Sequence, residues 1–194
     1  MRPQNPFTWA SGWKSPIYCD NRITLSFPAV RTYIRQELCS AILANFDKPD
    51  VIAGVATGGV PQGVLVAQEL GIPFIYIRSA SKEHGMGNLI EGLYEEGQKV
   101  VVIEDLISTG GSSLKAVESL REAGLIVKGL ACIFTYGFSL AERNFEKAEC
   151  PYITLTDYSV LIDQALSANY INEEDLVELR KWKENPAKWN SPEK

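Results

Sequence analysis

The stretch VVVIEDLISTGG, residues 100–111, decides how the rest of the chain is interpreted. Four apolar residues lead into two adjacent acids, Glu104 and Asp105, and two aliphatic residues then lead into hydroxyl residues and glycines. A short, continuous apolar run bounded by small residues is typical of a strand that is buried on both faces. Such strands belong to parallel sheets, whose ligands bind at the carboxyl ends of the strands. The sequence therefore predicts an α/β fold with the two acids at a ligand-binding edge.

The segments on either side of this strand alternate between helix and strand. The first predicted helix, for example, has apolar residues at Val30, Ile34, Leu38 and Ile42, the spacing of an amphipathic helix. The predicted helices are 26–46, 61–70, 112–124 and 139–148, and the predicted strands are 51–55, 73–78, 99–105, 127–136 and 152–156. Because parallel neighbours need crossover connections, this order predicts a mainly parallel central sheet flanked by helices on both faces.

The length of 194 residues fits a single domain, 1–194. Residues 1–25 do not fit the alternation, and the aromatic, glycine and proline residues within them predict a small N-terminal hood over one end of the sheet. The α/β core is predicted to span 26–165. A C-terminal helix beginning at Asn172 and a loose tail are predicted within 166–194.

The composition excludes several classes of protein. A net charge of -5 argues against nucleic acid or an anionic membrane surface as partner. No apolar run approaches the roughly 20 residues that span a bilayer, and the N-terminal residues lack a secretory signal, which predicts a cytoplasmic protein. The four cysteines have no C-x-x-C spacing and only one histidine beside them, so structural zinc is not expected.

The loop after the two acids suits a phosphate. Backbone amides at the start of a helix, bared by glycine and small hydroxyl residues, form a concave anion site. The acids upstream suit vicinal sugar hydroxyls, or a magnesium ion held through water. The same loop residues are also ordinary in a capped turn from strand to helix. Because the dinucleotide motif G-x-G-x-x-G and the Walker motif are absent, a phosphorylated ribose is the ligand that the pattern favours.

The pattern of residues 100–112 resembles the phosphoribosyl pyrophosphate signature of the type I phosphoribosyltransferases. The resemblance implies the type I phosphoribosyltransferase fold, and it implies that Glu104 and Asp105 contact the ribose hydroxyls. It assigns the 5'-phosphate to Ser108, Thr109, Gly110, Gly111 and Ser112. The stretch GVATGGVP, residues 54–61, resembles the pyrophosphate loop of the family, which implies contacts from Thr57 and Gly58.

Two further stretches resemble the orotate-specific members of the family. Residues 7–22, FTWASGWKSPIYCDNR, carry the hood pattern S-G-x-x-S-P-x-Y-x-D, and residues 78–92, RSASKEHGMGNLIEG, resemble the mobile catalytic loop. The roles implied are catalysis by Lys82, His84 and Asp105, binding of phosphoribosyl pyrophosphate by Arg78, and binding of orotate by Ser15, Pro16, Tyr136 and Phe138. Mg²⁺ is the implied cofactor, held mainly by substrate and water, with no direct protein ligand assigned.

The resemblance implies an enzyme that joins orotate to phosphoribosyl pyrophosphate, giving orotidine 5'-monophosphate and pyrophosphate for pyrimidine biosynthesis. It also implies a homodimer with the catalytic loop shared across the interface. Two alternatives stay open: a regulator of this fold that binds the sugar diphosphate without catalysis, and a purine phosphoribosyltransferase. The sequence departs from the family pattern at Ala10 and Ser79, where many relatives carry basic residues, and at Gly58, where some relatives carry a lysine.

Overall fold

The structure is a computed structural model that describes residues 1, 5–9, 12–79 and 89–189 of the chain. The chain forms two compact units. One unit comprises Asn21–Thr156 and contains the central sheet, and the other combines Met1–Asp20 with Asp157–Lys194.

The central sheet has six strands among the described residues, in the order β5-β4-β3-β6-β7-β8. Their bounds are β3 (Val51–Val55), β4 (Phe74–Ile77), β5 (Ile90–Glu91), β6 (Lys99–Ile107), β7 (Ile126–Thr135) and β8 (Tyr152–Asp157). β3 pairs in parallel with β4 and with β6, and β6 pairs in parallel with β7. The prediction of a mainly parallel sheet is therefore confirmed, and the strand that carries the two acids lies inside it rather than at an edge. That strand was predicted to end at Asp105, but it continues to Ile107, because Leu106 and Ile107 still pair with β7.

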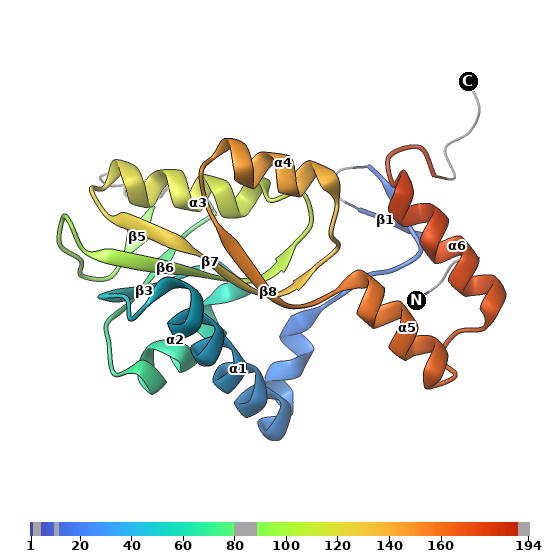
Figure 1. Cartoon of the computed structure of the whole chain (residues 1–194), viewed down its shortest axis with the longest axis horizontal. Coiled ribbons are helices and arrows are strands. Elements are labelled where there is room, and N and C mark those ends of the chain that lie inside the picture. Colours follow the sequence, from blue (N-terminus) through green and yellow to red (C-terminus); the bar gives the residue numbers. More distant parts are fainter. Residues whose placement is uncertain (2–4, 10–11, 80–88, 190–194) are drawn as a thin grey trace. The chain divides into compact units, whose positions relative to one another are not determined.

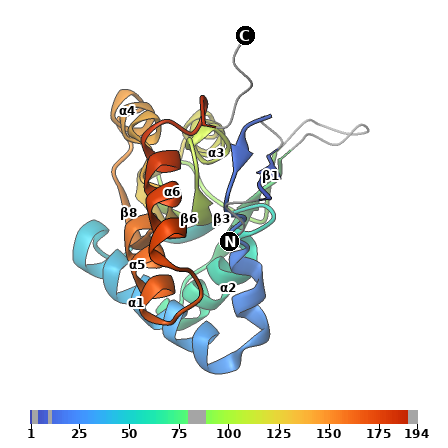
Figure 2. The same cartoon turned by 90° about the vertical axis from the view of Figure 1, so that its right-hand side faces the viewer.

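Helices cover both faces of this sheet. α1 (Pro28–Phe46) and α2 (Gly59–Leu70) lie on one face, and α3 (Gly111–Glu122) and α4 (Ser139–Lys147) lie on the other (Figures 1 and 2). Successive strand residues point to opposite faces, so β6 contributes to two apolar cores. Val101 and Ile103 pack in the core that contains α1 and α2, whereas Val100 and Val102 pack in the core that contains α3 and α4. This alternation sets the direction of the two acids that follow.

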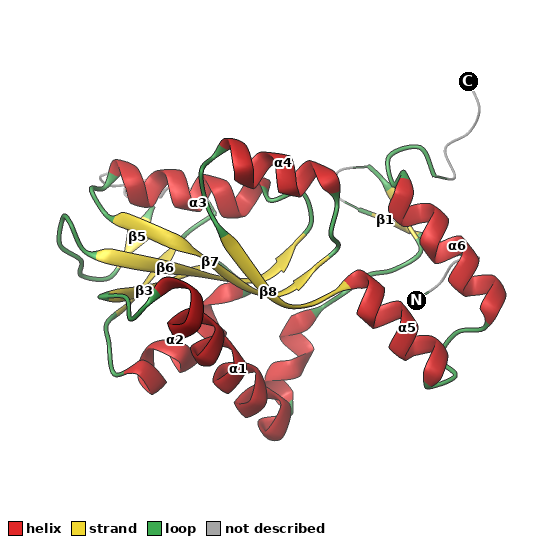
Figure 3. Cartoon of the chain, in the orientation of Figure 1, coloured by secondary structure: helices red, strands yellow, loops and turns green. Residues whose placement is uncertain are grey.

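From η1 onward, the structure adds three elements that the sequence did not predict. β5 pairs antiparallel with β4 within a stretch predicted to be irregular, and a two-residue strand is too short to show a periodic pattern. A short 3-10 helix, η1 (Asn21–Ser26), precedes α1. A helix α5 (Tyr158–Ser167) follows β8 directly, with Asp157 capping its first amides (Figure 3).

The second unit brings both ends of the chain into one small core. It contains an antiparallel pair, β1 (Phe7–Thr8) and β2 (Lys14–Ser15), with α5 and α6 (Glu173–Glu184). α6 begins after Asn172, as predicted, and Asn172 and Asp175 form a capping box. The fully buried Trp182 donates its indole N–H to the carbonyl of Lys14 at 3.0 Å. Its ring also packs against Trp9 and Tyr158, with centroids 5.6 and 5.3 Å away.

Replacing Trp182 with alanine is expected to destabilise this unit by about 3–5 kcal/mol, because the change removes a buried aromatic ring and leaves a cavity. Urea unfolding followed by circular dichroism measures the change. Tyr170→Ala is the matched control, since Tyr170 belongs to the same unit and is 86% exposed. Equal unfolding midpoints for Trp182→Ala and the control would contradict the role of Trp182 as the centre of this core.

Candidate active site

The two acids at the end of β6 point to different helices because successive strand residues alternate between faces. The hydroxyl of Ser113, in α3, donates to Glu104 Oε2 at 3.1 Å, which places the Glu104 carboxylate on the α3 face. The Asp105 carboxylate lies against Gly58, the residue that precedes α2 on the opposite face. One strand thus delivers one carboxylate to the start of each of two helices.

Glu104 is 5% exposed and is held on both carboxylate oxygens. The backbone N–H of Asp105 donates to Oε1 at 3.0 Å, and Ser113 binds Oε2. Burial, followed by the hydrogen bond and the charge of the neighbouring Asp105 carboxyl, raises the pKa of Glu104 from 4.5 to about 8. The Asp105 N–H and the Ser113 hydroxyl oppose this rise, since they favour the ionised form. Glu104 is therefore a buried acid whose charge the fold disfavours when no ligand is bound.

The raised pKa of Glu104 predicts a pH-dependent stability. Between about pH 4.5 and 8 the folded state keeps a proton that the unfolded state has lost, so the free energy of unfolding should fall as the pH rises through this range. Glu104→Gln lacks the titration, and its stability relative to the wild type should rise over the same interval. Urea unfolding of both proteins at several pH values tests this. A difference between them that stays constant with pH would contradict it.

The segment between β3 and α2 passes very close to β6. A Cβ atom on Gly58 would overlap the carboxylate of Asp105, and one on Gly59 would overlap the carbonyl of Ile103. The absence of a side chain on both glycines lets the backbone come within contact of β6: Gly59 lies against its backbone, and Gly58 lies against the Asp105 side chain. Asn21 in η1 adds a hydrogen bond from its side-chain amide to the Asp105 carbonyl at 2.7 Å. The segment around Asp105 is thus held by the glycines before α2 and by Asn21 of η1.

The loop from Ser108 to Gly110 joins β6 to the N-terminus of α3, and the order of strand, loop and helix is the one that the sequence predicts. Gly110 has a φ of +80°, a conformation that favours glycine, and its carbonyl accepts the N–H of Leu114 at 2.9 Å. Asn144 of α4 donates to the Thr109 carbonyl at 2.9 Å, and the ring of Phe145 leaves no room for a side chain on Gly110. The loop is anchored from α4, so the amides at the start of α3 are already arranged for an anion.

Asn21, Asn144 and Ser113 were not singled out by the sequence analysis. The two asparagines give no sequence signal, because their partners are backbone carbonyls far away in the chain. Ser113 does leave a signal: it is a polar residue on the buried stripe of α3 that also contains Ala116, Val117 and Leu120.

Comparisons with known proteins agree with this arrangement. The family of phosphoribosyl transferase domains matches residues 28–164. The chain is 55% identical over 191 residues to the orotate phosphoribosyltransferase of Bacteroides thetaiotaomicron, an alignment that covers 98% of this chain and 90% of that protein. Identity to the orotate phosphoribosyltransferase of Listeria innocua is 55% over 189 residues, covering 97% and 90%. This chain belongs to the orotate phosphoribosyltransferase family.

Solved structures give the same fold. The orotate phosphoribosyltransferase of Aeropyrum pernix superposes with a TM-score of 0.76 at 25% identity, covering 86% of this chain and 92% of that one. The UMP synthase of Leishmania donovani superposes with a TM-score of 0.79 at 28% identity, covering 93% of this chain and 38% of that one. An adenine phosphoribosyltransferase from Leishmania tarentolae, at 24% identity and a TM-score of 0.62, shares the fold alone.

The residues assigned to orotate by the family resemblance are divided between the two units. Tyr136 and Phe138 follow the end of β7, where their rings stack with centroids 5.4 Å apart and are 2% and 5% exposed. Ser15 and Pro16 belong to the other unit, and the Ser15 hydroxyl donates to the carbonyl of Ile17 at 2.7 Å. Their contacts with orotate stay a prediction.

The residues predicted to form the catalytic loop are only partly described. Lys82, His84 and Gly85 lie outside the described residues, as does Ala10 of the hood. Arg78 stands at the end of β4, with its guanidinium 3.6 Å from the carboxylate of Glu91 in β5. Ser79, which takes the place of a basic residue in many relatives, is exposed. The described residues thus place Arg78 at the carboxyl end of the sheet, the edge where β6 delivers its acids.

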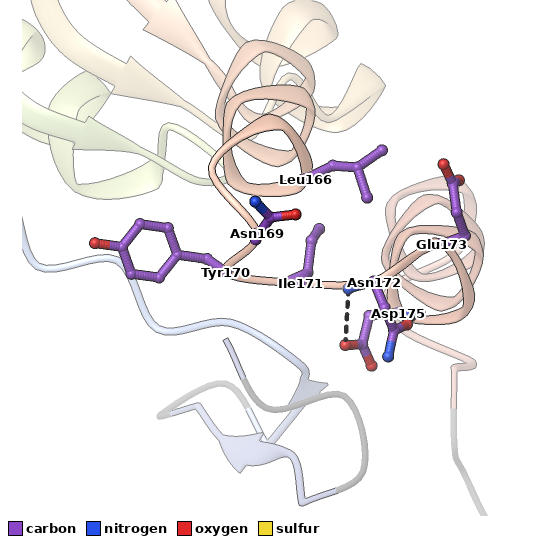
Figure 4. A pocket seen from close by; sticks show the side chains of 7 residues that line it. All are labelled: Leu166, Asn169, Tyr170, Ile171, Asn172, Glu173 and Asp175. Carbon is purple, nitrogen blue, oxygen red and sulfur yellow. Dashed lines mark hydrogen bonds between the residues drawn. The ribbon is translucent and has the colours of Figure 1, made fainter.

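A pocket of about 650 Å³ lies between α5 and α6, and none of the residues predicted to bind substrate lines it (Figure 4). Its lining includes Leu166, Asn169, Glu173 and Asp175. Two carboxylates without a cationic side chain in the lining disfavour a diphosphate or an orotate carboxylate. The carboxyl-terminal part of β6, with its two acids and two neighbouring helix starts, is therefore the better candidate for the substrate site.

The described residues contain neither a metal-binding cluster nor a membrane-spanning helix. No group of three or more histidine, cysteine, aspartate or glutamate side chains gathers where it would hold a metal ion. None of the described helices has the length and apolar character needed to cross a bilayer.

Proposed function

We propose that this chain transfers the phosphoribosyl group of phosphoribosyl pyrophosphate to orotate, giving orotidine 5'-monophosphate and pyrophosphate in pyrimidine biosynthesis. The observation that supports it most strongly is the end of β6, where two carboxylates meet the starts of α2 and α3. The ligand carries sugar hydroxyls, a 5'-phosphate and a pyrophosphate, which match two acids flanked by two helix N-termini. Curated orotate phosphoribosyltransferases at 54–56% identity support the choice of orotate.

Each part of the sugar diphosphate has a proposed place. The 5'-phosphate binds at the loop formed by Ser108, Thr109, Gly110, Gly111 and Ser112, where the amides of α3 begin. The ribose hydroxyls donate to Glu104 and Asp105. The pyrophosphate binds Thr57 and Gly58 before α2, with Arg78 supplying positive charge. These are roles that the family resemblance implies and that the geometry of the described residues fits.

The reaction breaks the bond between C1' of the ribose and the pyrophosphate oxygen, and it forms a bond from C1' to a ring nitrogen of orotate. That nitrogen loses its proton, which balances the proton that the leaving pyrophosphate takes up. Positive charge develops on C1' as pyrophosphate leaves with the bonding electrons. The carboxylate of Asp105 stabilises that charge by Coulomb attraction in a partly buried site. Lys82 and His84 are proposed to neutralise the leaving group and to supply a proton to it, and closure of their loop would exclude water.

Mg²⁺ is proposed as cofactor because the substrate carries a diphosphate, which binds this ion strongly through its oxygens. When bound, the ion neutralises part of the charge of the leaving pyrophosphate. The acids at the end of β6 are oxygen groups that suit the water shell of Mg²⁺, and no residue of the chain is assigned as its direct ligand. Turnover that persists in excess chelator would remove this part of the proposal.

A homodimer is also proposed, and a cytoplasmic location with it. Four apolar side chains along η1 and α1, Ile23, Phe27, Val30 and Tyr33, are 44–62% exposed, which is typical of a surface that another protein covers. Light scattering with size-exclusion chromatography tests the dimer. A monomer at micromolar concentration would contradict it.

A panel of bases tests the function. Purified protein, phosphoribosyl pyrophosphate and Mg²⁺ should release pyrophosphate with orotate and not with adenine, hypoxanthine or guanine. Release with a purine instead would make the chain a purine phosphoribosyltransferase. Binding of phosphoribosyl pyrophosphate by calorimetry, without release for any base, would favour the regulator.

A further inference from the structure

Ser113 is a polar residue at a buried position of α3, where an apolar residue is usual. It lies on the buried stripe of α3 with Ala116, Val117 and Leu120, and it is 1% exposed. A hydroxyl moved from water into such a core is destabilising unless it makes a hydrogen bond. Its hydrogen bond is to Glu104 Oε2, at 3.1 Å. The hydroxyl thus has a partner, and the partner is one of the two acids proposed to bind the ribose.

Among the side chains around Glu104, Ser113 donates the hydrogen bond to Oε2. On the neighbouring strand β7, Cys132 stands directly opposite Glu104. The thiol of Cys132 donates to the carbonyl of Phe134 at 3.3 Å, so it is directed to the backbone and not to the acid. On β6 itself, Asp105 donates its backbone N–H to Oε1, and its carboxyl, which lies against Gly58, is also near enough to interact with the Glu104 carboxyl. Ser113 is therefore the side chain from α3 that fixes Oε2.

We propose that Ser113 is a positioning residue for phosphoribosyl transfer: its hydroxyl holds the Glu104 carboxylate in the orientation that receives the ribose hydroxyls. Because Oε1 and Oε2 are held by donors from β6 and α3, rotation of the carboxylate is restricted before substrate binds. A donor to Oε2 also favours the ionised form, the form that accepts hydrogen bonds from both sugar hydroxyls. This inference rests on the proposed function, since it assigns the ribose to Glu104.

Replacing Ser113 is predicted to weaken the binding of the sugar diphosphate and to leave the binding of the base unchanged. In Ser113→Ala we expect the Kd of phosphoribosyl pyrophosphate, measured by calorimetry, to rise about tenfold, the loss typical of one hydrogen bond to a charged group. Its KM should rise in parallel, and the KM for orotate should stay within about twofold because the base does not touch Glu104. Ser113→Thr, which keeps a hydroxyl, should recover most of the affinity.

Two controls separate positioning from a general structural effect. Ser119→Ala removes a hydroxyl from the same helix, where Ser119 bonds the carbonyl of Lys115 on an exposed face, and should leave the Kd unchanged. In a Glu104→Gln background, Ser113→Ala should change the Kd by less than about twofold, because residues that act as a unit give non-additive effects.

The outcomes are distinct. A tenfold loss in the wild-type background that disappears with Glu104→Gln supports the proposal. The same loss in both backgrounds, or no loss in either, overturns it. A wild-type chain that binds phosphoribosyl pyrophosphate but does not use orotate would overturn the proposed base while the Ser113 measurement keeps its meaning. A wild-type chain that does not bind the sugar diphosphate would overturn both.

Discussion

Replacing Asp105 with asparagine is expected to lower kcat/KM for orotidine 5'-monophosphate formation by about 100- to 1,000-fold, the range seen when one preorganised electrostatic group is removed. The change keeps the size and shape of the side chain and removes its charge. The backbone of Asp105 keeps its hydrogen bonds, since Asn21 contacts its carbonyl and Glu104 accepts from its N–H. Asp105→Asn should therefore lose turnover while its free energy of unfolding stays at the wild-type value.

Asp163→Asn is the matched control for this variant. Asp163 is an exposed acid that pairs with Arg180 at 3.2 Å, and an exposed pair contributes little to stability. Both variants should unfold at the wild-type urea midpoint, and the control should keep wild-type turnover. Wild-type activity in Asp105→Asn would refute the role assigned to this acid.

Replacing Gly58 with alanine is expected to lower kcat/KM by about tenfold to a hundredfold while the protein stays folded. The backbone of Gly58 has ordinary right-handed helical angles, φ -67° and ψ -36°, so alanine is not strained there. The new Cβ would instead overlap the Asp105 carboxylate. A short side chain can rotate away from that contact, and a rotated Asp105 no longer faces the ribose.

Gly59→Ala provides the contrast. Its Cβ would overlap the carbonyl of Ile103, a backbone atom of β6 that cannot move without distorting the sheet. Gly59→Ala should therefore lower the free energy of unfolding by roughly 1–3 kcal/mol, the range for overpacking a core. Gly58→Ala should leave that free energy within about 0.5 kcal/mol of wild type. The assignment of Gly58 to the site would be wrong if both variants lost stability equally and Gly58→Ala kept full turnover.

The sequence predicted those parts of the fold whose pattern is local. The apolar run 100–103, the acids after it and the small residues before α3 predicted a strand, a loop and a helix, and these appear in that order, with the strand extending two residues beyond Asp105 to Ile107. The spacing in α1 likewise predicted most of its buried face: Ile34, Leu38 and Ile42 lie in the core, whereas Val30, which has the same spacing, is exposed.

Features that depend on residues distant in the chain could not be predicted in this way. Trp182 closes a core with Lys14 and Trp9, more than 160 residues earlier, and nothing in either segment indicates the other. The anchoring of Thr109 by Asn144 is of the same kind. Ser113 is intermediate: its place on an apolar stripe could have marked it, but its bond to Glu104 appears only when β6 and α3 are packed together.

The measurement that tests the central claim most directly is the ultraviolet absorbance of orotate in a mixture with purified protein, phosphoribosyl pyrophosphate and Mg²⁺. The absorbance should fall as orotidine 5'-monophosphate forms, and it should stay constant when any one component is left out. An orotate absorbance that does not change in the complete mixture, with the protein folded and Mg²⁺ in excess, would contradict the proposed function.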